Sequence, residues 1–381
     1  MKVLHVIPSL SPSRGGPGIV LRQIMTGLSM NGVIVHTATT DDDGPDAFLQ
    51  VPHGVAVSES GGECFYFARQ TRFYSFSWPL TRWLSRHIGE YDVVHIHALF
   101  SYPSTAAAYL ARRARVPYLL RPLGTLAQWG LSSRRPLLKR LSLTLNERRM
   151  LRGAAAVQAT SEQERAEVLT ACPDCRAVVI PNPVAMPSNL PARPFRNKPA
   201  AILFLSRLDP KKGLEVLLNA FDRVAEREPD IRLTVAGGGI PDYVASIRRL
   251  AESLAARDRV SFTGEVNGER KDILFADADL FVLPSRSENF GVAVAEAMAH
   301  AVPVLISQDV GIHIEVTGAD AGRTAPCETE PLADAIRQML SDPAGLRRMG
   351  ENGRQFALGH YSGHLIARLL LNEYETAMRQ S

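Results

Sequence analysis

The chain has 381 residues, with 43 basic and 39 acidic side chains that give a formal net charge of +4. Its composition is ordinary for a globular protein, and its length predicts two domains rather than one core. The small net charge argues against bulk nucleic-acid binding but leaves room for local basic patches.

Cysteine usage and hydropathy narrow the class of protein further. Four cysteines make no disulfide framework and indicate a reducing compartment. The spacing of Cys172 and Cys175 resembles a redox or metal motif, but no second pair or nearby histidine completes a site, so incidental thiols are the favoured interpretation. The N-terminal apolar run is short for a secretory signal, and no apolar stretch of about 18 residues predicts a membrane span. We therefore expect a cytoplasmic protein.

A strand, a glycine-rich loop and a helix open the chain. The apolar run 3–7 predicts the strand, the loop 8–18 contains the tetrapeptide GGPG, and 19–30 has a helical pattern. Such a loop lets the backbone approach an anion closely. It does not match the dinucleotide fingerprint, and a flexible turn is the alternative interpretation. Further strands are predicted at 33–40 and 54–57, and an amphipathic helix at 76–87.

Two histidines end a buried strand at 92–97. Alternate residues of a strand share a face, so His95 and His97 lie on the same side of the predicted sheet. Strand C-termini are where α/β sites form, so either imidazole can serve as an acid or base, and a structural role is the alternative. No third ligand stands nearby in the sequence, so a metal site is disfavoured.

Basic residues dominate the next fifty positions. A strand at 117–120 ends at Arg121, and the segment 132–153 carries seven basic side chains against one acid, with leucines at roughly helical spacing. This pattern predicts a basic amphipathic helix. It is either a solvated face over an ordinary core, the default interpretation, or a surface that meets anionic lipid or a lipid-linked diphosphate acceptor.

The second half of the chain begins after a proline-rich stretch. Residues 181–199 contain six prolines and predict an interdomain linker. A strand at 201–205 then runs into the loop SRLDPKKG, which carries Arg207 and Lys212. Cations between a strand and a helix suit a diphosphate group, although a charged surface loop is the alternative.

The most informative stretch is 281–306, which predicts a strand, a loop, a helix and a second strand of one parallel sheet. Its helical part carries one carboxylate, Glu296, among apolar side chains. Burying an unpaired carboxylate costs on the order of several kcal/mol, so Glu296 needs hydrogen-bond donors such as vicinal sugar hydroxyls. Glu288 stands eight positions earlier, at the same helix mouth. The alternative is that Glu296 snorkels or pairs with an arginine while Glu288 caps a helix.

The pattern S-x-x-E-N-F-G, followed by E-A-M-A and P-V, resembles the E-x7-E signature of the retaining family-4 glycosyltransferases, which have the GT-B fold. The resemblance implies that Glu288 contacts the transferred sugar and Glu296 the ribose of a nucleotide. Arg207 and Lys212 match the family's pair of cations on the departing diphosphate. Ala301 replaces the glycine that is common before P-V, which concerns a turn rather than the chemistry.

The resemblance also implies the remaining site residues. Substrate contacts carry over to Gly15, Gly16, Gly238, Gly264, Val266, Asn289, Phe290, Gly291 and Val292. Many relatives have a histidine near the reacting sugar at the place that we count as Arg121. An arginine is no base at neutral pH but can clamp a phosphate or carboxylate, so proton removal falls to the donor's own phosphate, or to His97 or His95.

We thus expect an α/β protein with the GT-B fold, in which two Rossmann-like domains face across a cleft. The expected parts are an acceptor-side domain at 1–184, the linker at 185–199, a nucleotide-sugar-binding domain at 200–360 and a C-terminal helix at 361–381 that packs back on the first domain. The D-x-D match at Asp277 and Asp279 stands before a strand rather than after one, so we interpret it as a connection and expect no metal.

The implied activity is hexosyl transfer with retention and without a metal or other cofactor. The expected donor is a nucleotide-diphosphate sugar, a UDP-sugar such as UDP-glucose in preference to a GDP-sugar. The expected acceptor is a glycan or lipid-linked saccharide of surface-polysaccharide biosynthesis, reached by peripheral contact with the inner face of the cell membrane, and no nucleic acid is involved. The alternative is a catalytically silent nucleotide-sugar-binding protein. A nicotinamide oxidoreductase would need the dinucleotide fingerprint that the chain lacks.

Overall fold

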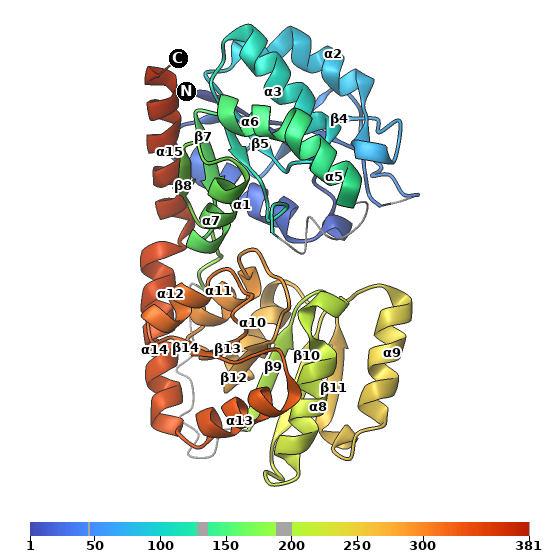
Figure 1. Cartoon of the computed structure of the whole chain (residues 1–381), viewed down its shortest axis with the longest axis vertical. Helices are drawn as coiled ribbons and strands as arrows, with labels where there is room; N and C mark the ends of the chain where they lie inside the picture. The colour runs from blue at the N-terminus through green and yellow to red at the C-terminus, as the bar shows by residue number, and fades with distance from the viewer. Residues whose placement is uncertain (45, 128–135, 188–199, 381) are drawn as a thin grey trace. The chain divides into compact units, whose positions relative to one another are not determined.

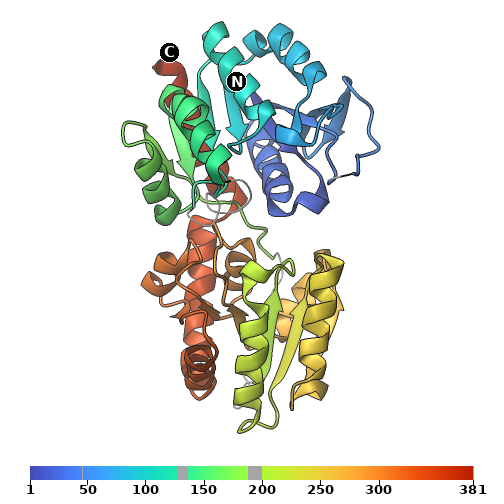
Figure 2. The same ribbon diagram turned by 45° about the vertical axis from the view of Figure 1, so that its right-hand side comes forward.

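The computed structural model describes residues 1–44, 46–127, 136–187 and 200–380. The chain divides into two compact units, one made of Met1–Pro183 with Gly363–Ser381 and the other of Val184–Ser362. Each unit is a sheet with helices on both faces (Figures 1 and 2). This is the two-sheet Rossmann-like architecture that the sequence predicts.

Within the described residues the sheet of the first unit has eight strands, in the order β3-β4-β2-β1-β5-β6-β7-β8. All neighbours are parallel except the hairpin of β3 and β4. The strands are β1 (Lys2–Ser9), β2 (Ile34–Thr40), β3 (Ala56–Glu59), β4 (Gly62–Phe67), β5 (Val93–His97), β6 (Tyr118–Arg121), β7 (Ala156–Ala159) and β8 (Ala177–Val179). The helices are α1 (Gly16–Ser29), α2 (Trp78–His87), α3 (Tyr102–Ala114), α5 (Pro136–Ser142), α6 (Arg148–Gly153), α7 (Glu162–Ala171) and α15 (Gly363–Arg379).

The described part of the second unit has a six-stranded parallel sheet in the order β11-β10-β9-β12-β13-β14. Its strands are β9 (Ala201–Leu205), β10 (Arg232–Ala236), β11 (Val260–Gly264), β12 (Leu280–Leu283), β13 (Val304–Ile306) and β14 (Gly322–Thr324). Its helices are α8 (Leu214–Ala225), α9 (Pro241–Glu252), α10 (Gly268–Asp277), α11 (Val292–Ala299), α12 (His313–Gly318), α13 (Thr329–Leu340) and α14 (Pro343–His360).

The strand order brings together the loops that carry the predicted site residues. The chain runs outward from β9 to β10 and β11, then returns to the other side of β9 and runs outward again from β12 to β13 and β14. In open α/β sheets a crevice forms at such a reversal, outside the C-terminal ends of the two central strands. The loops that follow β9 and β12, which carry the predicted cations and Glu288, therefore meet at one place.

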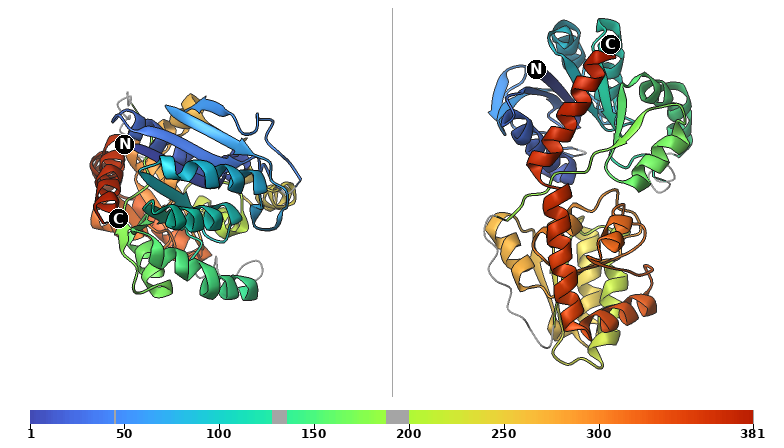
Figure 3. Two further views of the ribbon diagram at one scale, coloured as in Figure 1. Left: turned by 90° about the horizontal axis from the view of Figure 1, so that it is seen from above. Right: turned by 90° about the vertical axis from the view of Figure 1, so that its left-hand side faces the viewer.

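Several element predictions are confirmed. The strand, loop, helix and strand of 281–306 are β12, α11 and β13, and the D-x-D residues connect α10 to β12. The C-terminal helix α15 packs against α1 and lies along the first unit, as the right-hand view of Figure 3 shows. A Cβ on Gly27 of α1 would lie 3.1 Å from the carbonyl oxygen of Gly363, so the absence of a side chain permits this close approach.

Other predictions differ from the structure or fall outside its described residues. The basic segment is helical over its whole described part, where α5 continues through a π-helical turn at Leu143–Glu147 into α6, and residues 132–135 lie outside the described part. The predicted strand at 54–57 is shifted to β3, and its partner β4 was not predicted. Most of the predicted linker, from 188 on, is likewise outside the described residues. Among described helices, none has the length and hydropathy needed to cross a bilayer.

Candidate functional site

Two loops form the centre of the site at the C-terminal ends of β9 and β12. The backbone N–H of Arg286 donates to the carbonyl of Lys211 at 2.7 Å, and the Ser285 hydroxyl donates to the same carbonyl at 3.0 Å. Gly213 has a φ of 67°, and a Cβ there would overlap the carbonyl oxygen of Pro284. Glycine is therefore required where the two loops touch.

A network of side-chain hydrogen bonds holds the two loops together. Arg286 donates to the Glu215 carboxylate at 2.6 Å and to the carbonyl of Pro210 at 3.0 Å, while the Tyr243 hydroxyl donates to the other oxygen of Glu215 at 2.9 Å. The hydrogen bond to Glu215 raises the pKa of Arg286, and burial raises that of Tyr243. The β12 loop is thus attached to the first turn of α8, which follows the lysine pair.

The loops bring together the residues predicted to act on a sugar diphosphate. Lys212 is 6% exposed and forms an ion pair with Glu288. Burial lowers the pKa of Lys212 to about 7, with further lowering by the positive charges of Lys211 and Arg207, while Asp209 acts in the opposite direction. Arg207 itself is exposed at the start of the loop. The sequence predicted these residues but not that Lys212 and Glu288 pair with each other.

Backbone contacts hold the Glu288 segment against the loop after β13. The N–H of Glu288 donates to Asp309 at 3.0 Å, and its carbonyl accepts from Gly311 at 2.8 Å. Phe290 is buried, with its ring edge-on to Tyr361 at 5.2 Å, so its side chain anchors the segment and only its backbone is available to a substrate. Gly291, with a φ of 87°, turns the chain into α11.

Glu296 on α11 is buried and has a cation as its partner. The Lys271 ammonium on α10 lies 2.6 Å from Glu296 Oε1. The sequence raised the alternative that an arginine pairs with Glu296; the structure has a lysine there, which sequence reasoning missed. The carboxylate keeps lone pairs for further donors, so this ion pair and a bound sugar hydroxyl are compatible.

A pocket of about 450 Å³ lies beside these loops, at the ends of β10 and β11. Gly238 and Gly264, both predicted, line it together with Leu208, Glu265 and other residues. A Cβ on Gly238 would overlap the Glu265 side chain, so a larger residue there would displace Glu265 in the pocket wall. Val266, also predicted, packs against the core of the unit instead.

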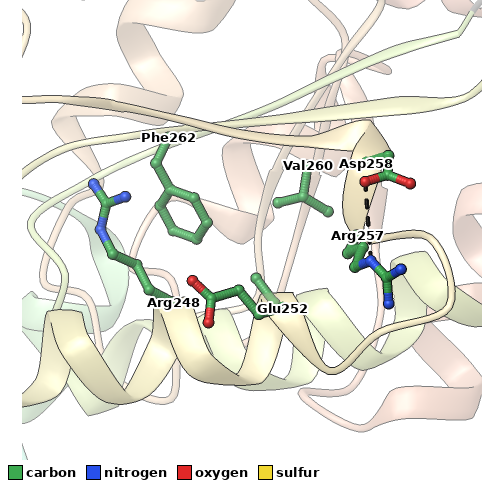
Figure 4. Close-up of a pocket in the computed structure, with 7 residues that line it drawn as sticks. Arg248, Glu252, Arg257, Asp258, Val260 and Phe262 are labelled. Atoms are coloured by element: carbon green, nitrogen blue, oxygen red, sulfur yellow. Dashed lines mark ion pairs between the residues drawn. The ribbon is translucent and has the colours of Figure 1, made fainter.

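A second hollow of about 340 Å³ adjoins this pocket, and Arg248 and Phe262 line both. The Arg248 guanidinium lies 4.9 Å from the centre of the Phe262 ring, and Figure 4 shows the two side by side, with Glu252 on the same helix as Arg248. A stacked arginine and phenylalanine hold each other in place. The pair thus forms part of the wall of both hollows.

The glycine loop of the first unit begins α1. Gly15 has a φ of 83° and closes a short 3-10 turn at Pro12–Arg14, whose conformation depends on Ser11 accepting from Ser13. A side chain on Gly16 would meet no atom within 4 Å, so Gly16 borders open space at the helix N-terminus. The loop is thus accessible, as a substrate-binding role requires.

The interior of the first unit contains three adjacent histidines. His97 Nε2 lies 2.9 Å from His5 Nδ1, and His95 Nδ1 lies 2.8 Å from the Tyr374 hydroxyl of α15. All three imidazoles are fully buried, and burial lowers their pKa values, that of His5 to about 3, so they are neutral at physiological pH. Their ligand atoms lie within 4.8 Å of one another. Sequence reasoning missed His5, which supplies the third histidine.

Arg121 lies beside this cluster and is 1% exposed. It donates to the Asn182 side chain, whereas its Nε and Nη1 have no hydrogen-bond partner among the described residues. Burial lowers the pKa of Arg121 to about 10, so it stays charged, and its charge opposes a cation at the histidines. Both side chains are enclosed in the first unit. The roles predicted for Arg121 and His97 in the reaction stay predictions.

Comparisons with known proteins agree for both units. Residues 15–183 match the family "Glycosyl transferase 4-like domain", and residues 187–356 match "Glycosyl transferases group 1". The uncharacterized glycosyltransferase YqgM of Bacillus subtilis is 28% identical over 343 residues, which cover 87% of this chain and 91% of YqgM. A GDP-mannose-dependent phosphatidylinositol monomannoside mannosyltransferase of Mycolicibacterium smegmatis is 30% identical over 186 residues, 46% of this chain and 48% of that protein.

Solved structures show the same fold over the whole chain. Sucrose-phosphate synthase from Thermosynechococcus elongatus superimposes with a TM-score of 0.79 at 22% identity and covers both chains completely. HepE from Anabaena, solved in complex with UDP and glucose, has a TM-score of 0.77 at 21% identity and covers 99% of this chain and 100% of that one. At such identities the likeness establishes the fold, which is GT-B.

Proposed function

Because the chain belongs to the group 1 glycosyltransferases, enzymes of the GT-B fold that use nucleotide-sugar donors, we propose that it transfers a hexose with retention and without a metal. The acceptor is a hydroxyl of a glycan or lipid-linked saccharide. The observation that carries this proposal is the meeting of the β9 and β12 loops, which brings Lys212 and Glu288 into contact beside Arg207.

The proposed roles follow from the charges in this site. Arg207 and Lys212 bind the donor diphosphate and stabilise the charge that develops on it as the glycosidic bond breaks. Glu288 accepts hydrogen bonds from hydroxyls of the transferred sugar, and Glu296 accepts from the ribose. Binding of the diphosphate takes over Lys212 from Glu288, which frees the carboxylate for the sugar.

Proton removal from the acceptor is assigned to the leaving diphosphate. As the acceptor oxygen forms its bond to the anomeric carbon, its proton passes to the departing phosphate oxygen, so charge and atoms balance. Arg121 stays protonated and cannot act as the base. His97 is buried against His5 and Arg121, and that supports a structural role rather than the alternative role of base.

A UDP-sugar such as UDP-glucose is the proposed donor, in preference to a GDP-sugar. Its support is the fold shared with HepE, whose solved structures contain UDP, glucose and UDP-glucose. A mannosyltransferase related to half of this chain depends on GDP-mannose, so the donor panel of the test below includes both bases.

A strongly basic segment supports a membrane-bound acceptor. Residues 132–153 carry seven basic side chains and one acid, a net +6 in a chain whose total is +4. Leu138, Leu141 and Leu145 are 48%, 57% and 60% exposed in the same segment, on α5 and the turn after it. Exposed leucines among arginines are typical of a helix that lies on anionic lipid. We place the enzyme in the cytoplasm, peripheral to the inner face of the cell membrane, in surface-polysaccharide assembly.

Vesicle binding tests this placement. At low salt the protein is expected to sediment with vesicles that contain phosphatidylglycerol and not with pure phosphatidylcholine. Replacing both Leu141 and Leu145 with serine should weaken this sedimentation, because it removes the two most exposed of the three leucines and keeps every charge. Equal sedimentation of the variant, or none of the wild type, would contradict a lipid-binding face.

The activity is tested by nucleotide release from UDP-, GDP- and ADP-sugars, with and without EDTA. We expect slow release of UDP from one UDP-sugar, unchanged by EDTA and abolished in Glu288→Ala. The matched control is Glu351→Ala, which removes an exposed carboxylate on α14. Tight binding of a donor without release, even with added glycan acceptors, would favour the alternative of a silent nucleotide-sugar-binding protein. Absence of binding to every donor would refute the proposal.

A further inference from the structure

We propose that Lys271 is a positioning residue of the donor site, which orients the Glu296 carboxylate toward the ribose hydroxyls of the nucleotide. The inference rests on the proposed function, because it takes the role of Glu296 from there. It goes further because it assigns Lys271 on α10 to donor recognition. It also predicts that the effect of Lys271 on nucleotide binding depends on the ribose hydroxyls.

The pair is close and largely shielded from water. Lys271 Nζ lies 2.6 Å from Glu296 Oε1, and the two side chains are 24% and 10% exposed. Glu296 stands in α11 between the fully buried Ala295 and Ala297. A carboxylate in such surroundings needs a counter-ion, and removing that counter-ion leaves an uncompensated charge. The Lys271–Glu296 ion pair therefore differs from exposed surface ion pairs, which contribute little to stability.

A second contact fixes α10 on α11 in the same register. Asp272, the next residue of α10, lies with Oδ1 3.1 Å from Nε2 of His300, one turn beyond Glu296. The other ring nitrogen of His300 lies 2.8 Å from the Glu296 carbonyl, and the ring stacks on Phe275 at 4.7 Å. Two neighbouring side chains of α10 thus contact Glu296 on α11 and His300, which caps the C-terminal end of α11. The position of the Lys271 ammonium is set by this packing.

The geometry leaves the carboxylate able to bind a diol. The ion pair uses Oε1, and a carboxylate has about four lone-pair sites, so acceptor sites remain for two vicinal hydroxyls. The segment that leads into α10 starts at Gly264 and Glu265, which line the pocket of about 450 Å³ at the ends of β10 and β11. One short stretch of chain therefore shapes that pocket and carries the lysine that orients Glu296.

The inference predicts that loss of the Lys271 side chain weakens the binding of nucleotides that have ribose hydroxyls and not of those that lack them. Lys271→Ala is expected to weaken the binding of UDP, or of the nucleoside diphosphate that the wild type prefers, by roughly tenfold, the scale of one charge-assisted contact. Binding of the 2′,3′-dideoxy analogue should change less than about twofold, because that ligand has no hydroxyls for Glu296. The donor KM should rise in parallel while kcat stays nearly unchanged, since the contact is far from the bond that breaks.

The experiment is isothermal titration of both nucleotides into the wild type, Lys271→Ala, Lys271→Arg, Glu296→Gln and the double variant Lys271→Ala/Glu296→Gln. Lys271→Arg should restore most of the affinity, and Lys271→Ala should have no further effect once Glu296 is Gln. Arg270→Ala is the matched control, because it removes a neighbouring exposed positive charge of α10. Thermal unfolding of each variant checks that α10 stays in place.

The outcomes separate this inference from the proposed function. Equal loss of affinity for the ribose and dideoxy ligands would mean that Lys271 contacts the phosphates or supports the fold, and would overturn the inference. Unchanged binding in Lys271→Ala, with weaker ribonucleotide binding in Glu296→Gln, would overturn it and leave the proposed function intact. A wild type that binds no nucleoside diphosphate would refute the proposed function itself.

Discussion

Raising the pH from about 6 to about 9 is expected to weaken donor binding, because Lys212 loses its charge in this range. The side chain is buried between the loops, and burial lowers its pKa to about 7, with help from the charges of Lys211 and Arg207. The charged form, which attracts the diphosphate, predominates below that pKa. The neutral form predominates above it and lacks this attraction.

The size of the effect follows from the pKa. If only the charged form binds, the apparent dissociation constant rises about tenfold for each pH unit above the pKa, roughly 1.4 kcal/mol per unit. Binding near pH 8 should thus be about tenfold weaker than the low-pH limit. The Glu288 carboxylate favours the charged ammonium, so in Glu288→Gln the loss of affinity should begin at lower pH.

The assay is calorimetric titration with an intact nucleotide sugar, whose diphosphate is esterified at both ends and keeps its charge over the whole range. Lys212→Arg is the decisive variant, because a guanidinium stays protonated up to a pH of about 12 and should give a flat profile. A wild-type dissociation constant that changes less than about twofold would refute the reasoning. So would an equal slope in Lys212→Arg, since another group would then be responsible.

Three further predictions concern stability and metal dependence. Gly213→Ala should lower the free energy of unfolding by roughly 2–4 kcal/mol, because its Cβ overlaps the Pro284 carbonyl and its φ is positive. A denaturant midpoint equal to that of the wild type would contradict this. Tyr374→Phe should cost about 1–3 kcal/mol in the same measurement, because it leaves Nδ1 of His95 unpaired in the interior, and a neutral result would show that the bond is dispensable. EDTA should leave the initial rate of transfer unchanged, whereas a rate restored by added zinc would point to the histidine cluster.

The central βα unit of the second half could be predicted because its signals are local. Both faces of β12 and β13 are covered, so each strand reads as a continuous apolar run, and Pro284 marks where the first one ends. Glu288 and Glu296 are separated by only eight positions, so the placement of one in the loop before α11 and of the other on α11 follows from the local pattern. No knowledge of the sheet order was needed.

The cations that pair with these carboxylates could not be predicted. Lys271 and Glu296 are 25 positions apart, and Lys212 and Glu288 belong to different βα units. What brings them together is the order of β9 and β12 in the sheet and the packing of α10 on α11. His5 has the same explanation, because it reads as part of an apolar run until the register of β1 on β5 sets it opposite His95.

The edge of the first sheet was missed for a different reason. Strand β4 begins at a glycine and contains a glutamate and a cysteine, so its pattern is neither the continuous apolar run of a central strand nor a clear alternation. Its stability comes from pairing with β2 on one side and β3 on the other. Such pairing is a property of the assembled sheet.

The chain path of α15 has a consequence for how the protein folds during synthesis. The second unit is one continuous stretch, Val184–Ser362, whereas the first is completed only by Gly363 and the residues after it. Until the ribosome has made α15, the surface of α1 around Gly27 is uncovered and His95 lacks its tyrosine. Domains usually mature in the order in which they are translated. Here the unit that is started first is finished last, so nascent chains halted before α15 should hold a folded second unit and an incomplete first one.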